Sequence, residues 1–95
     1  MALTNIYVIE AEFGAYKIGI ARDVSKRLSQ LRVGLPFALE SVRSVEIPET
    51  DALAVETSLH KRYGAWRMRG EWFGLPPKFE TAKAFADDVC GCAEL

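Results

Sequence analysis

The sequence predicts a small α/β domain in which a mostly antiparallel, three-stranded sheet is flanked by helices. Two short runs of β-branched and aromatic residues near the N-terminus indicate a hairpin, and two later segments have the apolar spacing of amphipathic helices. The 95 residues are 49% hydrophobic and 26% charged, which is ordinary for one globular domain. We therefore expect a single domain over residues 1–95, with elements in the order ββαβα followed by a C-terminal helix.

The first two strands are expected over residues 6–9 and 16–20, joined by a short turn. Both carry apolar residues on both faces, so helices should cover both faces of the sheet. If the pairing is centred on Glu12, Tyr7 lies opposite Lys17. An ammonium group beside a phenol favours the phenolate, so we expect the pKa of Tyr7 to lie below its usual value near 10.

A helix is expected to follow the hairpin, with Asp23 as its N-cap and its end near Arg32. Its apolar residues recur every third or fourth position and form a buried stripe. Gly34 and a following proline end it. A third strand is then expected over residues 39–47.

Thr50 is expected to cap a second helix over residues 51–63. Residues 66–70 have the composition of an exposed basic loop, and residues 71–73 that of a short extended piece that closes the sheet edge. A final helix is expected over residues 78–89.

Two cysteines, Cys90 and Cys92, are too few and too close for a disulfide scaffold. We expect free thiols in a frayed tail. The N-terminus has no basic segment followed by an apolar one, and no stretch approaches the roughly 20 apolar residues of a membrane span. These features lead us to expect a cytoplasmic protein.

Charge is distributed unevenly along the chain, although the formal net charge is only −1. Ten of the 12 lysines and arginines, but only six of the 13 acids, lie between Lys17 and Arg69. This balance excludes a strongly basic clamp for nucleic acid and favours a local basic face for an anionic partner. Each cation is alternatively an ordinary solvated charge. The candidates for contacts to backbone phosphates are Arg22, Lys26, Arg32, Arg67 and Arg69.

The second expected helix carries an acid in its apolar stripe. Glu56 falls among the residues that should face the core, which are Ala52, Val55, Leu59 and Tyr63. A buried carboxylate costs several kcal/mol unless it is paired or binds a metal, typically more than a domain this small can offset. His60 lies one turn further along, so a hydrogen-bonded pair of the two is the structural alternative to a site.

Other candidates also have structural alternatives. Arg27 flanks the apolar stripe of the first helix and should lie at the rim of the sheet, where it either contacts a ligand or pairs with a carboxylate. A tyrosine such as Tyr7 in a strand is usually part of the core. Trp66 either stacks on an unpaired base or packs, whereas Trp72 and Phe73 are expected in the core.

Several short blocks together resemble the GIY-YIG nuclease superfamily over about residues 6–75, leaving a C-terminal helix and tail over residues 78–95. The blocks are Asn5-Ile6-Tyr7, Lys17-Ile18-Gly19, the helix with Arg27, and the later Glu56. Asn5 stands where the family has its first glycine, and Lys17 where it has its second tyrosine. The string Gly70-Glu71-Trp72-Phe73 is similar to a small phage and bacterial branch described as DNA-binding or nuclease-like.

This resemblance implies an endonuclease that hydrolyses DNA phosphodiester bonds with Mg²⁺ or Mn²⁺. In that mechanism Tyr7 is the base, helped by Lys17, while Arg27 contacts the phosphate and Glu56 binds the metal. His60 either shares in proton transfer or orients Glu56. DNA is the expected partner, with RNA second. The alternatives are a catalytically weak or inactive nucleic-acid-binding module and, third, an interaction domain that binds no nucleic acid.

Overall fold

The computed structural model describes residues 2–94, which form five strands and three helices. None of these helices is long and apolar enough to cross a membrane. The α/β class is confirmed, but the sheet has five strands rather than three. The elements are β1 (Leu3–Ala11), β2 (Ala15–Ala21), α1 (Val24–Arg32), β3 (Leu39–Pro48), α2 (Ala52–Arg62), β4 (Arg67–Arg69), β5 (Trp72–Gly74) and α3 (Ala82–Ala93).

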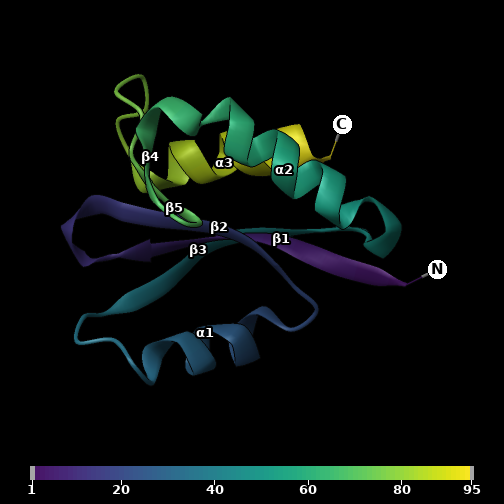
Figure 1. Cartoon of the computed structure of the whole chain (residues 1–95), viewed down its shortest axis with the longest axis horizontal. Coiled ribbons are helices and arrows are strands. Elements are labelled where there is room, and N and C mark those ends of the chain that lie inside the picture. Colours follow the sequence, from purple (N-terminus) through teal and green to yellow (C-terminus); the bar gives the residue numbers. More distant parts are fainter. Residues whose placement is uncertain (1, 95) are drawn as a thin grey trace.

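The strands form one antiparallel sheet in the order β3-β1-β2-β5-β4. Helix α1 covers one face, while α2 and α3 lie on the other (Figure 1). This arrangement explains why β1 is apolar on both faces: Ile6 and Val8 pack with the core around α2 and α3, whereas Tyr7 and Ile9 pack on the α1 side. The expectation that helices cover both faces is confirmed.

The register of the first hairpin differs from the expected one. Tyr7 pairs with Gly19, and Lys17 pairs with Ile9. The turn is centred on Phe13, which adopts a left-handed φ of 71°, so each partner shifts by two positions from a turn centred on Glu12. The expected pairing of Tyr7 with Lys17 is therefore wrong.

The helix ends follow their capping groups. Asp23 caps α1 as expected, because its carboxylate accepts a hydrogen bond from the Lys26 backbone N–H at 3.0 Å. Thr50 does not cap α2, since it lies inside a 3₁₀ turn over Glu49–Asp51 that leads directly into the helix. Helix α3 starts later than expected, after Thr81, whose hydroxyl accepts from the Ala84 backbone N–H.

The C-terminal end of α3 is part of the core rather than a frayed tail. The helix continues to Ala93, and Cys90 is fully buried while Cys92 is partly buried. Both are free thiols, as expected. The tail prediction was wrong because the apolar spacing continues through Val89, Cys90 and Ala93.

The extended piece expected over residues 71–73 corresponds to β5, whereas β4 was expected to be a loop and was not predicted as part of the sheet. Each has only three residues, too few to establish an alternation of apolar and polar positions. They form a hairpin that adds to β2, with Phe73 opposite Tyr16 and completely buried. Glu71, in the turn of this hairpin, lies close to Gly19 of β2.

Candidate functional site

The ring of Tyr7 lies across Gly19, its partner in the neighbouring strand. A Cβ atom at Gly19 would lie 2.6 Å from the Cζ atom of Tyr7 and 3.1 Å from Glu71 Oε1. No real Cβ atom is found at such a distance from a rigid ring, so only glycine admits the phenol here. Gly19 thereby leaves room for both the Tyr7 hydroxyl and the Glu71 carboxylate beside β2.

The Tyr7 hydroxyl reaches the surface although the ring is buried. The side chain is only 2% exposed and packs against the α1 side of the sheet. Within residues 2–94 its hydroxyl forms no hydrogen bond, and no buried side-chain nitrogen or oxygen lacks a partner. The hydroxyl therefore lies at the small part of the residue that remains exposed.

The pKa of Tyr7 is raised to about 12, which contradicts the expected lowering. Burial is the main cause, and the negative charge of Glu71 adds to it; Arg27 acts in the opposite direction, and Glu56 raises the pKa further. The phenol is consequently protonated at neutral pH. Tyr7 is not activated as a phenolate in the free protein.

Lys17 does not act on Tyr7 because it is paired elsewhere. Its Nζ atom lies 3.1 Å from Glu71 Oε1 and 5.5 Å from the centre of the Trp72 ring. The lysine side chain is only 15% exposed. Lys17 therefore fastens the β4–β5 hairpin to β2 through an ion pair that the sequence did not predict.

Glu71 is the acid around which the site is built, although the sequence pointed to it only as part of the Gly70-Glu71-Trp72-Phe73 string. Its backbone carbonyl accepts a hydrogen bond from the Ile18 N–H at 3.3 Å. Its carboxylate pairs with Lys17 and acts electrostatically on both Tyr7 and Glu56. The available signal was its position between Gly70 and two core aromatic residues, where an acid has no packing role.

His60 holds α2 against the same point of β2. Its Nε2 atom lies 3.0 Å from the Ile18 carbonyl oxygen, so Nε2 carries the proton and donates it. Its ring also packs on Phe73, with centroids 5.2 Å apart. The Ile18 N–H thus donates to the Glu71 carbonyl, and the Ile18 carbonyl accepts from His60. These two hydrogen bonds hold the β4–β5 hairpin and α2 against the same residue of β2.

Glu56 is half-buried on α2, on the opposite face of the sheet from Tyr7 and Arg27. Within residues 2–94 no hydrogen bond or ion pair joins Glu56 to His60, so the expected structural pair is not formed. The pKa of Glu56 is raised because of burial and because of Glu71, while His60 and Lys17 oppose the rise. The charge of Glu71, at the edge of β2, therefore raises the pKa values of both Glu56 and Tyr7.

Arg27 lies on the exposed side of α1 next to a hollow of about 270 Å³. Arg22 and Lys26 also line this hollow. In the described part of the chain, no carboxylate lies within ion-pair distance of Arg27 or Lys26. Because the charge of Arg27 lowers the pKa of Tyr7, its guanidinium belongs electrostatically to the same site.

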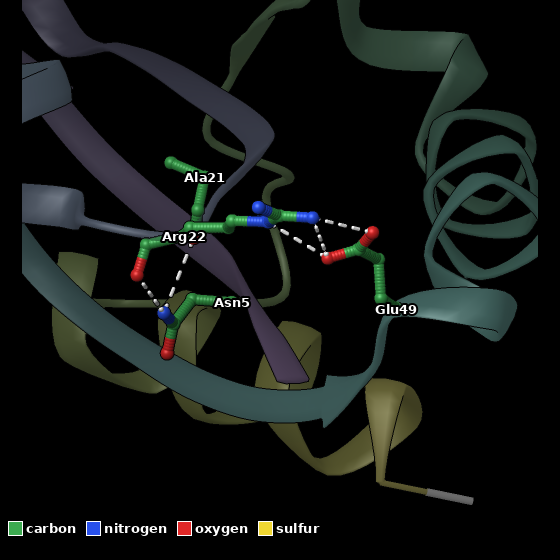
Figure 2. A network of polar contacts seen from close by, with 4 residues as sticks. All are labelled: Asn5, Ala21, Arg22 and Glu49. Atoms are coloured by element: carbon green, nitrogen blue, oxygen red, sulfur yellow. Dashed lines mark hydrogen bonds and ion pairs between the residues drawn. The ribbon is translucent and has the colours of Figure 1, made fainter. Parts of the chain in front are cut away.

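Arg22 belongs to a polar network that fixes the connection between β2 and α1 (Figure 2). The Asn5 Nδ2 group donates to the carbonyl oxygens of Ala21 and Arg22, each at 3.1 Å. The Arg22 guanidinium donates to both carboxylate oxygens of Glu49, at 2.7 and 2.8 Å, and lowers the pKa of that carboxyl. The network positions the start of α1 and therefore Arg27.

The remaining predicted phosphate contacts are dispersed. Arg32 donates to the Leu39 carbonyl at 2.7 Å, and Arg67 donates to the Gly70 carbonyl at 2.6 Å. Arg69 is exposed on β4, at the opposite edge of the sheet from β3. The structure therefore places Lys26 with Arg27, and Arg67 with Arg69, as two separate basic surfaces; binding of nucleic acid by them stays a prediction.

The acids of the site allow a loosely held metal ion rather than an enclosed one. Within residues 2–94, no three His, Cys, Asp or Glu side chains gather as a metal-binding group. Mg²⁺ commonly binds through one or two carboxylates and keeps several waters. Glu56, with Glu71 acting on it, fits a hydrated ion of this kind.

A model of the T5orf172 domain matches residues 4–90, nearly the whole chain. The chain belongs to the T5orf172 domain family. Membership of the GIY-YIG superfamily, which the sequence blocks suggested, is wrong, because the matching family is a different one. Those blocks instead mark a local feature, a glycine that lets a tyrosine cross the neighbouring strand.

T5orf172 domains are nuclease-associated and DNA-binding-like, which is compatible with a nucleic-acid-related function and with DNA as partner. No curated protein and no solved structure matches this T5orf172 domain.

Proposed function

We propose that this T5orf172 domain is a Mg²⁺-dependent endonuclease that nicks DNA. The observation that carries the proposal is the solvent-reaching hydroxyl of Tyr7, which lies among the charges of Arg27, Glu71 and Glu56. The ring of Tyr7 packs in the core on the α1 side, whereas packing gives no reason for a hydroxyl among charged groups of both signs. The family's nuclease association supports the same conclusion.

Arg27 is the residue that contacts the scissile phosphate. Its guanidinium is exposed and free of ion pairs in residues 2–94, and Lys26 shares its hollow. A guanidinium donates two parallel hydrogen bonds to phosphate oxygens and stabilises the negative charge that develops on phosphorus during attack. Asp23 and Asn5 fix the start of α1 and so hold Arg27 in place.

Glu56 is the carboxylate that binds Mg²⁺, with Glu71 close enough to act on it. The ion, when bound, supplies positive charge that supports the leaving oxygen. Burial and the neighbouring acid both disfavour the charged form of Glu56 in the free protein. A divalent cation relieves that repulsion, which is the reason for assigning the metal to this carboxylate.

Tyr7 positions the attacking water rather than removing its proton. With a pKa of about 12, its hydroxyl remains protonated at neutral pH and serves as a hydrogen-bond donor or acceptor. The charge of Glu71 acts on Tyr7 more strongly than the charge of Glu56 does. Glu71 is therefore the carboxylate that accepts the proton of the water. Lys17 holds the Glu71 carboxylate at that place through their ion pair.

A nucleic-acid-binding module without catalysis is the second candidate. Two observations favour it: the raised pKa of Tyr7 and the ion pair of Lys17 with Glu71 leave no preformed phenolate base. The two functions differ in one measurable result. A binding module retains DNA in the presence of Mg²⁺ without changing it.

Incubation of the purified protein with supercoiled plasmid, in Mg²⁺ or in chelator, tests the proposal. We expect Mg²⁺-dependent conversion to the nicked circle, strongly reduced in Tyr7→Phe, which keeps the ring and removes only the hydroxyl. Lys61→Ala, which removes an exposed cation on the outer side of α2, serves as the matched control and should nick normally. Binding without nicking by the wild type supports the second candidate, and equal nicking by Tyr7→Phe removes Tyr7 from the mechanism.

A further inference from the structure

The hairpin of β4 and β5 presents an unusual surface at the edge of the sheet. Strand β4 is the last strand on its side, and its three residues are all exposed. Met68 is 63% exposed, and Trp66, immediately before the strand, is 37% exposed. Neither side chain belongs to a core cluster, and each leaves a substantial apolar surface exposed at the sheet edge.

A β-bulge interrupts the pairing of β4 at Met68. Arg67 pairs with Phe73 and Arg69 pairs with Trp72, so Met68 is an extra residue without a partner on β5. Bulges redirect a side chain and are frequent beside active sites. The bulge therefore places a flexible apolar side chain between two arginines on an open edge.

The positive charge of the segment over residues 64–70 favours the binding of an anion. Residues 64–70 contain two arginines and no acid. Arg67 is held over the turn by its hydrogen bond to the Gly70 carbonyl, while Arg69 has no ion pair within residues 2–94. Apolar side chains flanked by guanidinium groups are complementary to exposed nucleotide bases and their phosphates.

The hairpin also leads directly into the candidate site. Gly70 makes the turn with a left-handed φ of 58°, and the next residue is Glu71, which lies over Gly19 beside Tyr7. Strand β5 then runs along β2 (Figure 1). A DNA strand whose phosphate reaches Glu71 and Arg27 would therefore meet the β4–β5 hairpin with its neighbouring nucleotides.

We propose that the β4–β5 hairpin binds unpaired nucleotides next to the scissile phosphate, so that the substrate is DNA with a bulge, gap or single-stranded segment. Met68 and Trp66 contact the faces of unpaired bases, and Arg67 and Arg69 contact the adjacent phosphates. Perfectly paired bases are stacked on each other and offer no such faces. This inference rests on the proposed function, whose site it extends.

Binding by the whole chain, measured in chelator by fluorescence anisotropy, tests the hairpin without requiring cleavage. Three labelled DNAs of equal length are compared: a perfect duplex, the same duplex with an unpaired bulge, and a single strand. The variants are Met68→Ala, Trp66→Ala and Arg69→Gln. Leu53→Ala and Lys61→Gln, at exposed positions on α2, are the matched apolar and charged controls.

The wild type should bind the bulged and single-stranded DNAs more tightly than the duplex. Trp66→Ala should weaken binding to the bulged and single-stranded DNAs by about 5- to 100-fold and binding to the duplex much less. Met68→Ala should also weaken binding to the bulged and single-stranded DNAs more than binding to the duplex. Arg69→Gln should weaken all three and reduce the slope of log K against log salt by about 0.7 to 0.9. The controls should match the wild type.

A wild type that prefers the perfect duplex overturns the inference, as does equal loss on all three DNAs in both Met68→Ala and Trp66→Ala. Met68→Ala guards against a folding defect at the partly buried Trp66. If the wild type nicks plasmid but the hairpin variants bind all three DNAs like the wild type, the role of the hairpin is refuted and the nuclease proposal is not. Selective binding without nicking would refute only the nuclease.

Discussion

The phenol ring of Tyr7 crosses the backbone of Gly19, its cross-strand partner, and carries its hydroxyl past β2 toward Glu71. This contact links the fold and the candidate site. It buries the ring on the α1 side of the sheet, and it brings the hydroxyl to the edge where the β4–β5 hairpin joins β2. The geometry requires a residue without a Cβ atom at position 19.

Gly19→Ala should destabilise the protein by about 1 to 3 kcal/mol, because the added methyl group overlaps the Tyr7 ring and the ring cannot move within its packed surroundings. Urea unfolding measures this change. Gly34→Ala, where nothing lies within 4 Å of the new methyl group, is the matched control and should change the free energy of unfolding little. In a Tyr7→Ala background the cost of Gly19→Ala should largely disappear, and a cost that persists there would contradict the contact.

Stability should fall steeply at alkaline pH because of the buried tyrosines. The pKa of Tyr7 is about 12 in the folded state and near 10 when unfolded, so its contribution is complete below pH 10 and is lost as pH rises toward 12. The loss amounts to at most about 2 to 3 kcal/mol for Tyr7. Tyr16, whose pKa is also raised to about 12, adds to the fall. Tyr7→Phe should show a shallower decline above pH 10, measured by urea unfolding across this range.

The same titration tests the role of Lys17. Because Lys17 pairs with Glu71 and does not contribute to the pKa of Tyr7, Lys17→Met should not raise the pKa of this phenol in ultraviolet difference spectra. Assignment to Tyr7 comes from comparison with Tyr7→Phe. A clear rise would show that the ammonium group stabilises the phenolate after all.

Glu56→Gln should abolish Mg²⁺-dependent nicking while leaving the protein equally or more stable. The folded-state pKa of Glu56 is raised, so its carboxylate form opposes folding at neutral pH. The advantage of the variant should therefore grow as pH rises through the titration of Glu56 and vanish in acid. Thermal melts at several pH values measure this difference, with Glu80→Gln on an exposed loop as control. A variant that melts far below the wild type would indicate a structural carboxylate.

The sequence predicted those parts of the fold that have long periodic segments. Residues 24–32 form the expected helix with its Asp23 cap, because capping and apolar spacing are local properties. The extended piece at residues 71–73 was predicted, but its pairing with β4 was not, because three-residue strands form only when a neighbouring edge is available. The register at Tyr7 depended on the left-handed Phe13, which no propensity scale favours.

The candidate site was predicted in part for similar reasons. Glu56 stood out because a carboxylate in an apolar stripe is detectable from spacing alone. Glu71 did not, since its role comes from the turn that places it beside Gly19. The partner of Lys17 and the direction of the Tyr7 pKa shift depend on that same turn, so both expectations failed together.

The nicking rate of Arg27→Ala, compared with its DNA affinity in chelator, tests the central claim most directly. If Arg27 stabilises charge on the attacked phosphate, the substitution should slow nicking by about 10² to 10³ while changing affinity little, because the interaction strengthens in the transition state. Lys61→Ala should nick like the wild type. Nicking by Arg27→Ala at the wild-type rate, or a loss of affinity that accounts for the whole loss of rate, would contradict the claim.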